Sequence, residues 1–302
     1  MAVSAGAAPA LRKLLRFSLS TANLERLAAF YSEAFGCRSS PVQRVTDAHF
    51  RALMAVAGGA QFQRLWLGQS CIELLQFDQS GAPYPPAAAA SDLLFQHFAI
   101  VVSDMQRAYE RLSSVAGWRR ISTAGPQQLP ARSGGVCAYK FRDPDGHPLE
   151  LLAFAPGQLP PAWRATADGA LCLGIDHSAI SVSDSARSIA FYEALGLRLY
   201  ARSINHGAEQ ARLDGLAEPQ VEVSALGLAE GAAHLELLCY RALARAAPIA
   251  LRNNDIAATR LVLQSAGAGP ARELLDPDGH HLLLLAGAAA TKTDNDAAWS
   301  ES

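Results

Sequence analysis

Histidine and glutamate recur at matching places in strand-like segments of this 302-residue chain. His97 and His177 each open an alternating apolar run, and a glutamate stands second in three short apolar tetrads. The tetrads are Ile72-Glu73-Leu74-Leu75, Leu149-Glu150-Leu151-Leu152 and Leu235-Glu236-Leu237-Leu238. Neutral imidazoles and carboxylates are the ligands that borderline or hard divalent cations take in proteins. These side chains are therefore the candidates for chemistry, provided that the fold brings them together.

The segments that carry these residues belong to an internal repeat. Residues 16–31 and 177–192 align without a gap, and both run from period-2 alternation through a polar turn into an amphipathic helix that ends at a glycine. Residues 97–105 repeat the same opening. Two identical Asp-Pro-Asp-Gly-His segments, residues 143–147 and 276–280, are typical of tight hairpin turns. Each repeat is therefore predicted to contain a strand, a helix and three further strands.

Four such modules account for most of the chain, at residues 11–80, 93–156, 172–242 and 248–287. The fourth is too short to contain its helix and one of its strands. We predict an α+β protein of two tandem domains, residues 11–158 and 172–288, in which paired βαβββ modules form cup-shaped mixed sheets. A segment rich in proline and glycine joins the two domains.

The strands that open with histidine, the Phe-Tyr pair on the first helix, the Asp-Pro-Asp-Gly-His turn and the Leu-Glu-Leu-Leu strand together resemble the vicinal oxygen chelate superfamily. This group includes glyoxalase I, extradiol dioxygenases, methylmalonyl-CoA epimerase and bleomycin-resistance proteins. The resemblance extends from about Leu11 to Gly287. It implies a fold of paired modules, but this fold hosts several activities.

The resemblance also implies that metal ligands come from the first and last strands of each module. Carried over by position, it assigns one set of positions to each domain. The first domain has Arg16, Glu73, His97 and Glu150, and the second has His177, Glu236, Asp255 and Leu283. Neither set is the complete family pattern.

In the first domain, the implied metal ligands are Glu73, His97 and Glu150, and the two glutamates are also the candidate proton-transfer groups. Arg16 stands where a ligand is expected, and a guanidinium repels a metal but pairs well with carboxylates. Two interpretations follow. Either Arg16 forms a buried salt-bridge cluster with Glu73 and Glu150 that replaces the metal, or it binds an anionic group of the substrate.

Further candidates lie nearby and in the second domain. Tyr139 and Phe141 alternate on a strand that borders the first cup, and we expect them in an aromatic wall that contacts the substrate. His177, Glu236 and Asp255 form a second candidate metal set, which lacks a closing carboxylate because Leu283 stands there.

Two kinds of chemistry suit such a site. A bound Zn²⁺, Ni²⁺, Mn²⁺ or Mg²⁺ can stabilise the anion that forms when a substrate with vicinal oxygens loses a proton, as in an isomerase or lyase of the glyoxalase type. Bound Fe²⁺ can activate O₂, as in an extradiol dioxygenase, but such sites usually use two histidines and one carboxylate. Because neither set has two histidines, the isomerase or lyase is favoured. The remaining alternative is a metal-free protein that binds small molecules, like the bleomycin-resistance group.

Composition limits the partners. The net charge of −2 and the pI near 6.4 give no electrostatic reason to expect binding to nucleic acid or to a membrane surface. Five cysteines without paired spacing indicate reduced thiols, and no secretory signal is apparent. We therefore expect a cytoplasmic monomer or homodimer whose partner is a small molecule.

Overall fold

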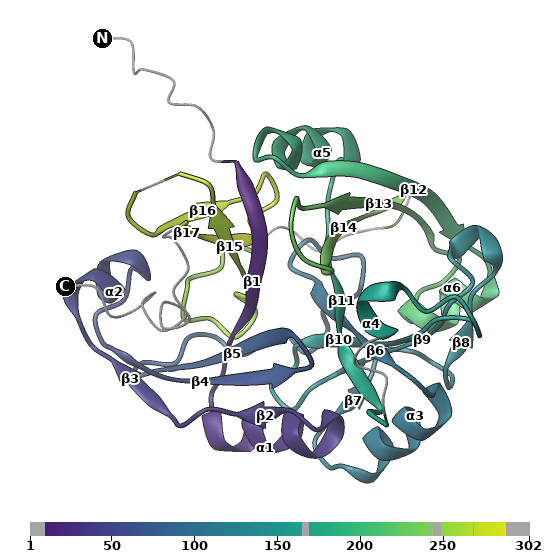
Figure 1. Cartoon of the computed structure of the whole chain (residues 1–302), viewed down its shortest axis with the longest axis horizontal. Helices are drawn as coiled ribbons and strands as arrows, with labels where there is room; N and C mark the ends of the chain where they lie inside the picture. Colours follow the sequence, from purple (N-terminus) through teal and green to yellow (C-terminus); the bar gives the residue numbers. More distant parts are fainter. Residues whose placement is uncertain (1–9, 165–168, 242, 244–248, 268, 288–302) are drawn as a thin grey trace.

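Two mixed β-sheets lie side by side in the molecule, with helices on their outer faces (Figure 1). The computed structural model describes residues 10–164, 169–241, 243, 249–267 and 269–287. The α+β class and the tandem arrangement of strand–helix–strand modules are confirmed.

The first sheet combines the first module with the fourth. Its strand order is β16-β17-β15-β1-β5-β4-β2, and β3 also pairs with β4. The strands are β1 (Leu11–Ser20), β2 (Arg38–Ser39), β3 (Gln43–Val45), β4 (Ala60–Leu67), β5 (Ser70–Phe77), β15 (Arg260–Ser265), β16 (Arg272–Leu275) and β17 (His281–Ala286). The fourth module is truncated as predicted, because its described residues form three strands and no helix.

The second sheet combines the second and third modules. Its strand order is β12-β13-β14-β11-β6-β10-β9-β7, and β8 also pairs with β9. The strands are β6 (Gln96–Val102), β7 (Arg119–Arg120), β8 (Gln127–Gln128), β9 (Cys137–Arg142), β10 (Pro148–Ala153), β11 (Cys172–Ser181), β12 (Arg198–His206), β13 (Gln220–Gly227) and β14 (His234–Arg241).

This pairing corrects one expectation. The sequence predicts that modules one and two share one cup and that modules three and four share the other. Instead, β1 pairs antiparallel with β15, and β6 pairs antiparallel with β11. Strand periodicity is local, so it identifies each strand without showing which distant strand lies beside it.

The helices begin where the polar turns predict. The helices are α1 (Leu24–Phe35), α2 (Ala48–Leu53), α3 (Met105–Ser114), α4 (Pro161–Arg164), α5 (Ser185–Ala194) and α6 (Ala208–Asp214), with a 3₁₀ turn η1 (Ala131–Ser133). Asn23, Asp104 and Asp184 cap α1, α3 and α5, each accepting a hydrogen bond from a backbone N–H of the first turn. Gly36 ends α1 in the left-handed conformation (φ 76°).

The Asp-Pro-Asp-Gly-His turns join modules that follow one another in the chain. The carboxylate of Asp143, in module two, accepts a hydrogen bond from the Tyr31 hydroxyl of α1 at 3.2 Å. Asp276, in module four, accepts the equivalent bond from Tyr192 of α5 at 3.0 Å. These bonds thus connect module one with module two and module three with module four, whereas the sheets join module two with module three and module one with module four.

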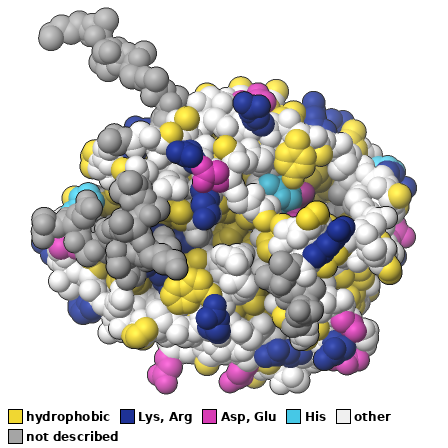
Figure 2. Space-filling model, in the orientation of Figure 1, with side chains coloured by type: hydrophobic (Ala, Val, Ile, Leu, Met, Phe, Trp, Pro, Cys, Tyr) yellow, Lys and Arg dark blue, Asp and Glu magenta, His cyan; other side chains and the backbone are white. Residues whose placement is uncertain are grey.

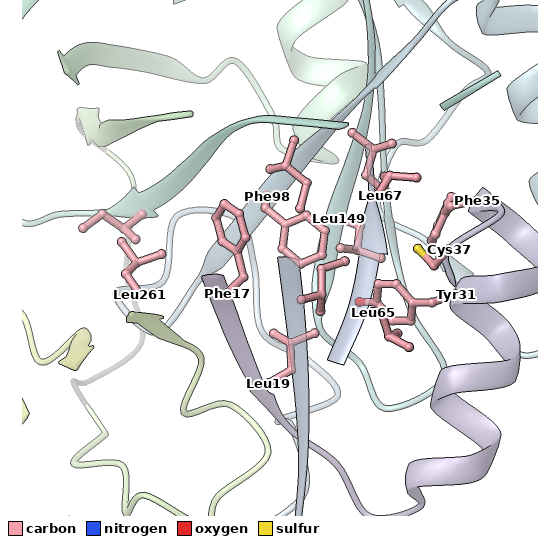
Figure 3. Packing of buried hydrophobic residues seen from close by; sticks show 14 of the residues in the cluster. Phe17, Leu19, Tyr31, Phe35, Cys37, Leu65, Leu67, Phe98, Leu149 and Leu261 are labelled. Atoms are coloured by element: carbon pink, nitrogen blue, oxygen red, sulfur yellow. The ribbon is translucent and has the colours of Figure 1, made fainter. Parts of the chain in front are cut away.

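One hydrophobic core runs between the two sheets. It includes Phe17 and Leu65 of the first sheet together with Phe98 and Leu149 of the second. Figure 3 shows these side chains facing one another, with Tyr31 of α1 beside them. The Phe-Tyr pair of α1 belongs to this core, as the sequence predicts.

Two further observations concern membrane-spanning helices and the cysteines. Within the described ranges, no helix has both the length and the apolar character needed to cross a bilayer. All five cysteines are unpaired.

Candidate metal site between modules two and three

The second sheet gathers two histidines and two glutamates at its centre. They lie on four adjacent strands, with His97 on β6, Glu150 on β10, His177 on β11 and Glu236 on β14. In the register, Ala99 of β6 is opposite both His177 and Glu150, and Ala179 of β11 is opposite both His97 and Glu236. The two modules therefore contribute one histidine and one glutamate each, related by a local two-fold arrangement.

The four side chains converge closely. His97 Nε2 lies 2.9 Å from Glu150 Oε2, and His177 Nε2 lies 3.6 Å from Glu236 Oε2. Ligand atoms of His97, Glu150 and His177 all lie within 4.8 Å of one another. This spacing is compatible with binding of a single cation between the two modules.

Burial and mutual charge set the protonation states. Burial lowers the pKa of His97 below its usual value. Burial alone would raise the pKa of Glu150, but His97 and Lys140 hold it below the usual value. For His177, burial alone would lower the pKa, but Glu236 and Asp176 raise it to about 9. Burial alone would raise the pKa of Glu236, but His177 and His234 lower it to about 2. Both carboxylates are therefore charged at neutral pH.

The donor set fits a divalent cation. Two imidazoles and two carboxylates suit borderline metals such as Zn²⁺ and Ni²⁺ and also Mn²⁺. Among the described residues, neither ring nitrogen of buried His97 has a hydrogen-bond partner of acceptable geometry, although Glu150 is within 2.9 Å. Buried polar atoms are normally paired, so an imidazole with this geometry beside a carboxylate is compatible with a cation that both side chains bind.

A cavity of about 420 Å³ opens onto these four residues. Its wall is largely apolar, and aromatic and aliphatic side chains from both modules contribute to it. These side chains include Leu129, Val136, Leu152, Phe154, Tyr200, Leu213, Val221, Val223 and Leu238. Figure 2 shows a histidine and acidic side chains together among hydrophobic ones on the face that exposes the second sheet. Such a cavity suits a small organic molecule.

Helix α6 closes one side of the cavity through a buried polar cluster. Asp214 of α6 accepts a hydrogen bond from Lys140 Nζ on β9 at 2.7 Å, and it also accepts from Gln210 and Tyr240. Asn205 and Gln210, from the polar run of module three, line the cavity as well. Lys140 is directly opposite Glu150 on the neighbouring strand, so its charge is close to the proposed ligands.

The equivalent centre of the first sheet lacks such a set. There the positions of the two histidines hold Arg16 and Arg260, and the positions of the two glutamates hold Glu73 and Leu283. Arg16 Nε lies 2.9 Å from Glu73 Oε2, and Arg64 Nε lies 3.2 Å from the same oxygen. The predicted salt-bridge cluster thus forms, but with Arg64 in place of Glu150.

Glu73 and Arg16 therefore do not share a cup with His97 and Glu150. The concave face of the first sheet is instead filled by apolar side chains of α2 and its surroundings, such as Phe50 and Met54. With its carboxylate bound by two guanidiniums inside this core, Glu73 has no access to the cavity of the second sheet.

Asp255 also lies outside the metal site, which corrects its assignment as the opening ligand of module four. It precedes β15, and its carboxylate accepts hydrogen bonds from the backbone of Ala82 and from Arg252. The opening position is Arg260, five residues later. The sequence predicts that this strand begins at Asp255, but residues 253–257 form a turn and β15 begins only at Arg260.

Tyr139 and Phe141 face the opposite side of β9 from the cavity. Both are buried in the core between the sheets, where they contact Trp118. The alternate residue Lys140 is the one that lines the cavity. The period-2 alternation predicted for this strand is present, but Lys140, and not Tyr139 or Phe141, faces the cavity.

The sequence also contains a signal for the candidate site between modules two and three. Only the second and third modules carry both an opening histidine and a closing glutamate. Pairing the two complete modules would have produced the four-residue set. Asp176 and His234, which also line the cavity beside His177, have no counterpart in the repeat that would have drawn attention to them.

Residues 13–151, the first two modules, match the family model described as the Glyoxalase/Bleomycin resistance protein/Dioxygenase superfamily. Among solved structures, glyoxalase I from Zea mays superposes with a TM-score of 0.55 at 19% identity, over 90% of this chain and 92% of that chain. A variant of the same maize enzyme gives a TM-score of 0.59 at 17% identity, over 96% and 97%.

A candidate dioxygenase from Bacillus subtilis superposes with a TM-score of 0.55 at 10% identity, over 95% of this chain and 89% of that chain. At these identities the likeness establishes the fold and not the activity. No curated protein sequence matches this chain significantly.

Proposed function

We propose that the second and third modules bind one divalent metal ion and catalyse an isomerase or lyase reaction, and the match of residues 13–151 to the Glyoxalase/Bleomycin resistance protein/Dioxygenase superfamily supports this proposal. The observation that carries the proposal is the convergence of His97, Glu150, His177 and Glu236 beneath a largely apolar cavity. The substrate is a small molecule with two vicinal oxygens.

The number of protein ligands favours this reaction over oxygen activation. His97, Glu150, His177 and Glu236 together would hold the ion, and a set of four protein ligands would leave fewer positions for other ligands than a set of three would. A dioxygenase of this type needs a further open position for O₂ and usually achieves it with three protein ligands. The two histidines that the structure brings together, His97 and His177, therefore do not by themselves favour iron.

The metal would supply Lewis-acid stabilisation of negative charge on the substrate oxygens. His97, Glu150, His177 and Glu236 would hold it, and Glu150 would also accept the proton that leaves the adjacent carbon of the bound substrate. Glu150 is buried and ionised, so it can act as a base only when the substrate has displaced water from the cavity. The apolar wall contributed by Leu152, Leu213 and Val223 would exclude that water.

Metal content tests the proposal directly. The protein, purified without chelators or a polyhistidine tag, is measured by elemental mass spectrometry alongside His97→Ala, Glu150→Ala, His177→Ala and Glu236→Ala. We expect about one Zn²⁺, Ni²⁺, Mn²⁺ or Mg²⁺ ion per chain, lost or strongly reduced in each of the four variants. Glu73→Gln and Asp255→Asn are the matched controls, since both alter buried carboxylates in the first sheet or beside it.

Other outcomes have definite meanings. Bound iron would favour a dioxygenase. Loss of the metal in Glu73→Gln but not in Glu236→Ala would place the site in the first sheet. Absence of metal even after reconstitution would refute the proposed enzyme and leave a metal-free protein that binds small molecules. The cytoplasmic location and the monomeric or dimeric state stay predictions.

A further inference from the structure

The strand that carries His177 contains a β-bulge at the site. Ile175 of β11 is opposite Ile100 of β6, but His177 is opposite Ala99, so Asp176 is an extra residue between two successive pairs. In a regular strand, neighbouring side chains point to opposite faces, whereas a bulge changes the direction of one of them. As a result, both Asp176 and His177 line the cavity.

Asp176 connects His177 to the segment between modules two and three. Its Oδ2 lies 3.1 Å from His177 Nδ1, while its other oxygen, Oδ1, accepts a hydrogen bond from the indole Nε1 of Trp163 at 3.3 Å. Trp163 belongs to the short helix α4 of the linker and is only 4% exposed. The two hydrogen bonds to separate oxygens fix the plane of the carboxylate.

Gly174 makes room for this indole. A Cβ atom at Gly174 would lie 2.5 Å from Trp163 Cζ3, closer than real contacts allow. The ring also packs against Val101 and Leu173. The linker tryptophan is therefore inserted against the strand that carries His177 and is not a loose surface residue.

We propose that Trp163 and Asp176 are positioning residues that fix the ring of His177 so that Nε2 points to the metal. A carboxylate that accepts the Nδ1–H bond selects the tautomer whose Nε2 is free to bind metal, and it restricts rotation of the ring. The inference rests on the proposed metal site. The first sheet supports it by contrast, because the equivalent bulge in β1 places Leu15 where β11 has Asp176, and no histidine follows it.

The test measures Co²⁺ binding rather than turnover. The dissociation constant is obtained by competition with a chelator, and the visible absorption spectrum of bound Co²⁺ reports the ligand geometry. We expect Asp176→Asn to weaken binding about 10- to 100-fold and to change the spectrum. Trp163→Phe, which keeps a ring but removes the N–H donor, is expected to act in the same direction with a smaller effect.

Two matched controls separate positioning from general destabilisation. Trp118→Phe alters an indole that packs on Tyr139 away from the cavity, and Asp255→Asn alters a buried carboxylate outside the second sheet. Neither is expected to change the Co²⁺ affinity or spectrum, and thermal unfolding is recorded for all variants. A variant that lowers the melting temperature but leaves the Co²⁺ spectrum and affinity unchanged would show a purely structural role and overturn the inference.

The remaining outcomes distinguish this inference from the proposed function. If the wild-type protein binds Co²⁺ and both variants bind it equally well, the inference fails and the metal site stands. If the wild-type protein does not bind Co²⁺, both fail. If Asp176→Asn and His234→Ala abolish binding while Trp163→Phe has no effect, Asp176 is itself a ligand and the positioning role is excluded, since Asp176, His177 and His234 also cluster.

Discussion

The same strand positions carry opposite chemistry in the two sheets. In the second sheet, ligand atoms of His97, Glu150 and His177 lie within 4.8 Å of one another, and Glu236 lies beside His177. In the first, the Arg16 guanidinium already occupies a ligand position and binds Glu73 directly, with a third charge from Arg64. An always-protonated guanidinium supplies the positive charge that a metal would otherwise supply. The first centre is therefore structural.

This contrast predicts a stability effect without a metal effect. Glu73→Gln removes the carboxylate that is shared by two buried guanidiniums, and breaking a buried ion pair on one side typically costs about 3–5 kcal/mol. We expect the free energy of unfolding in urea to fall by about this amount, while the metal content of the second sheet is unchanged. Glu33→Gln, on the exposed face of α1, is the control and should have almost no effect. A stable Glu73→Gln protein that has lost metal would contradict this assignment.

At the scale of elements, the hairpin turns act as connectors between modules. Besides accepting from Tyr31, Asp143 binds the imidazole of His147, whose Nδ1 lies 2.8 Å from Asp143 Oδ2. The other ring nitrogen, Nε2, lies 3.0 Å from the carbonyl oxygen of Ile256, just before β15. Because both nitrogens face acceptors, the ring donates to both only when it is protonated. One turn thus links modules one, two and four.

This arrangement predicts a pH dependence of stability. Burial alone would lower the pKa of His147, but Asp143 raises it above the usual value. A raised pKa in the folded state gives a stabilisation that is complete below the unfolded value, about 6.5, and is lost as the pH rises through the folded value. We expect the difference in unfolding free energy between the wild type and His147→Gln to be largest near pH 6 and to shrink toward alkaline pH.

Urea unfolding at several pH values measures this difference. The exposed His49→Gln variant provides the control, because its imidazole is solvated in both states. A difference between wild type and His147→Gln that stays constant with pH would show that the imidazole contributes only as a neutral hydrogen-bonding group.

At the scale of the whole molecule, each sheet combines one module from residues 11–158 with one module from residues 172–288. A cut through the linker at α4 would divide the second sheet between β6 and β11 and leave half of the proposed metal site on each side. The shared core strengthens this connection, since Phe17 of β1 packs on Phe98 of β6 with ring centroids 5.2 Å apart. Residues 11–158 and residues 172–288 therefore share both sheets and one hydrophobic core.

We expect the chain to unfold in a single transition. Two variants test this, one keeping only Trp66 of the first sheet and the other only Trp118 of the second as fluorescent tryptophans. Their fluorescence transitions in urea should coincide with each other and with far-UV circular dichroism. If the Trp66 signal is lost at a clearly different urea concentration from the Trp118 signal, the two sheets unfold independently.

The sequence by itself determined what depends on local interactions. Period-2 strands, the helix caps at Asn23 and Asp184 and the hairpin turns are each specified by residues close in the chain, so the class, the four modules and the truncation of the last were predicted. The positions of His97, Glu150, His177 and Glu236 on strands were predicted for the same reason.

Only the tertiary structure decided which modules meet. The pairing of β6 with β11 depends on the fit of two strands distant in sequence, and it unites His97 and Glu150 with His177 and Glu236. The face that each strand turns inward is also a property of the assembled sheet, which is why Lys140, and not Tyr139, lines the cavity. The bulge at Asp176 depends on the register of the same pairing, so alternation alone did not predict it.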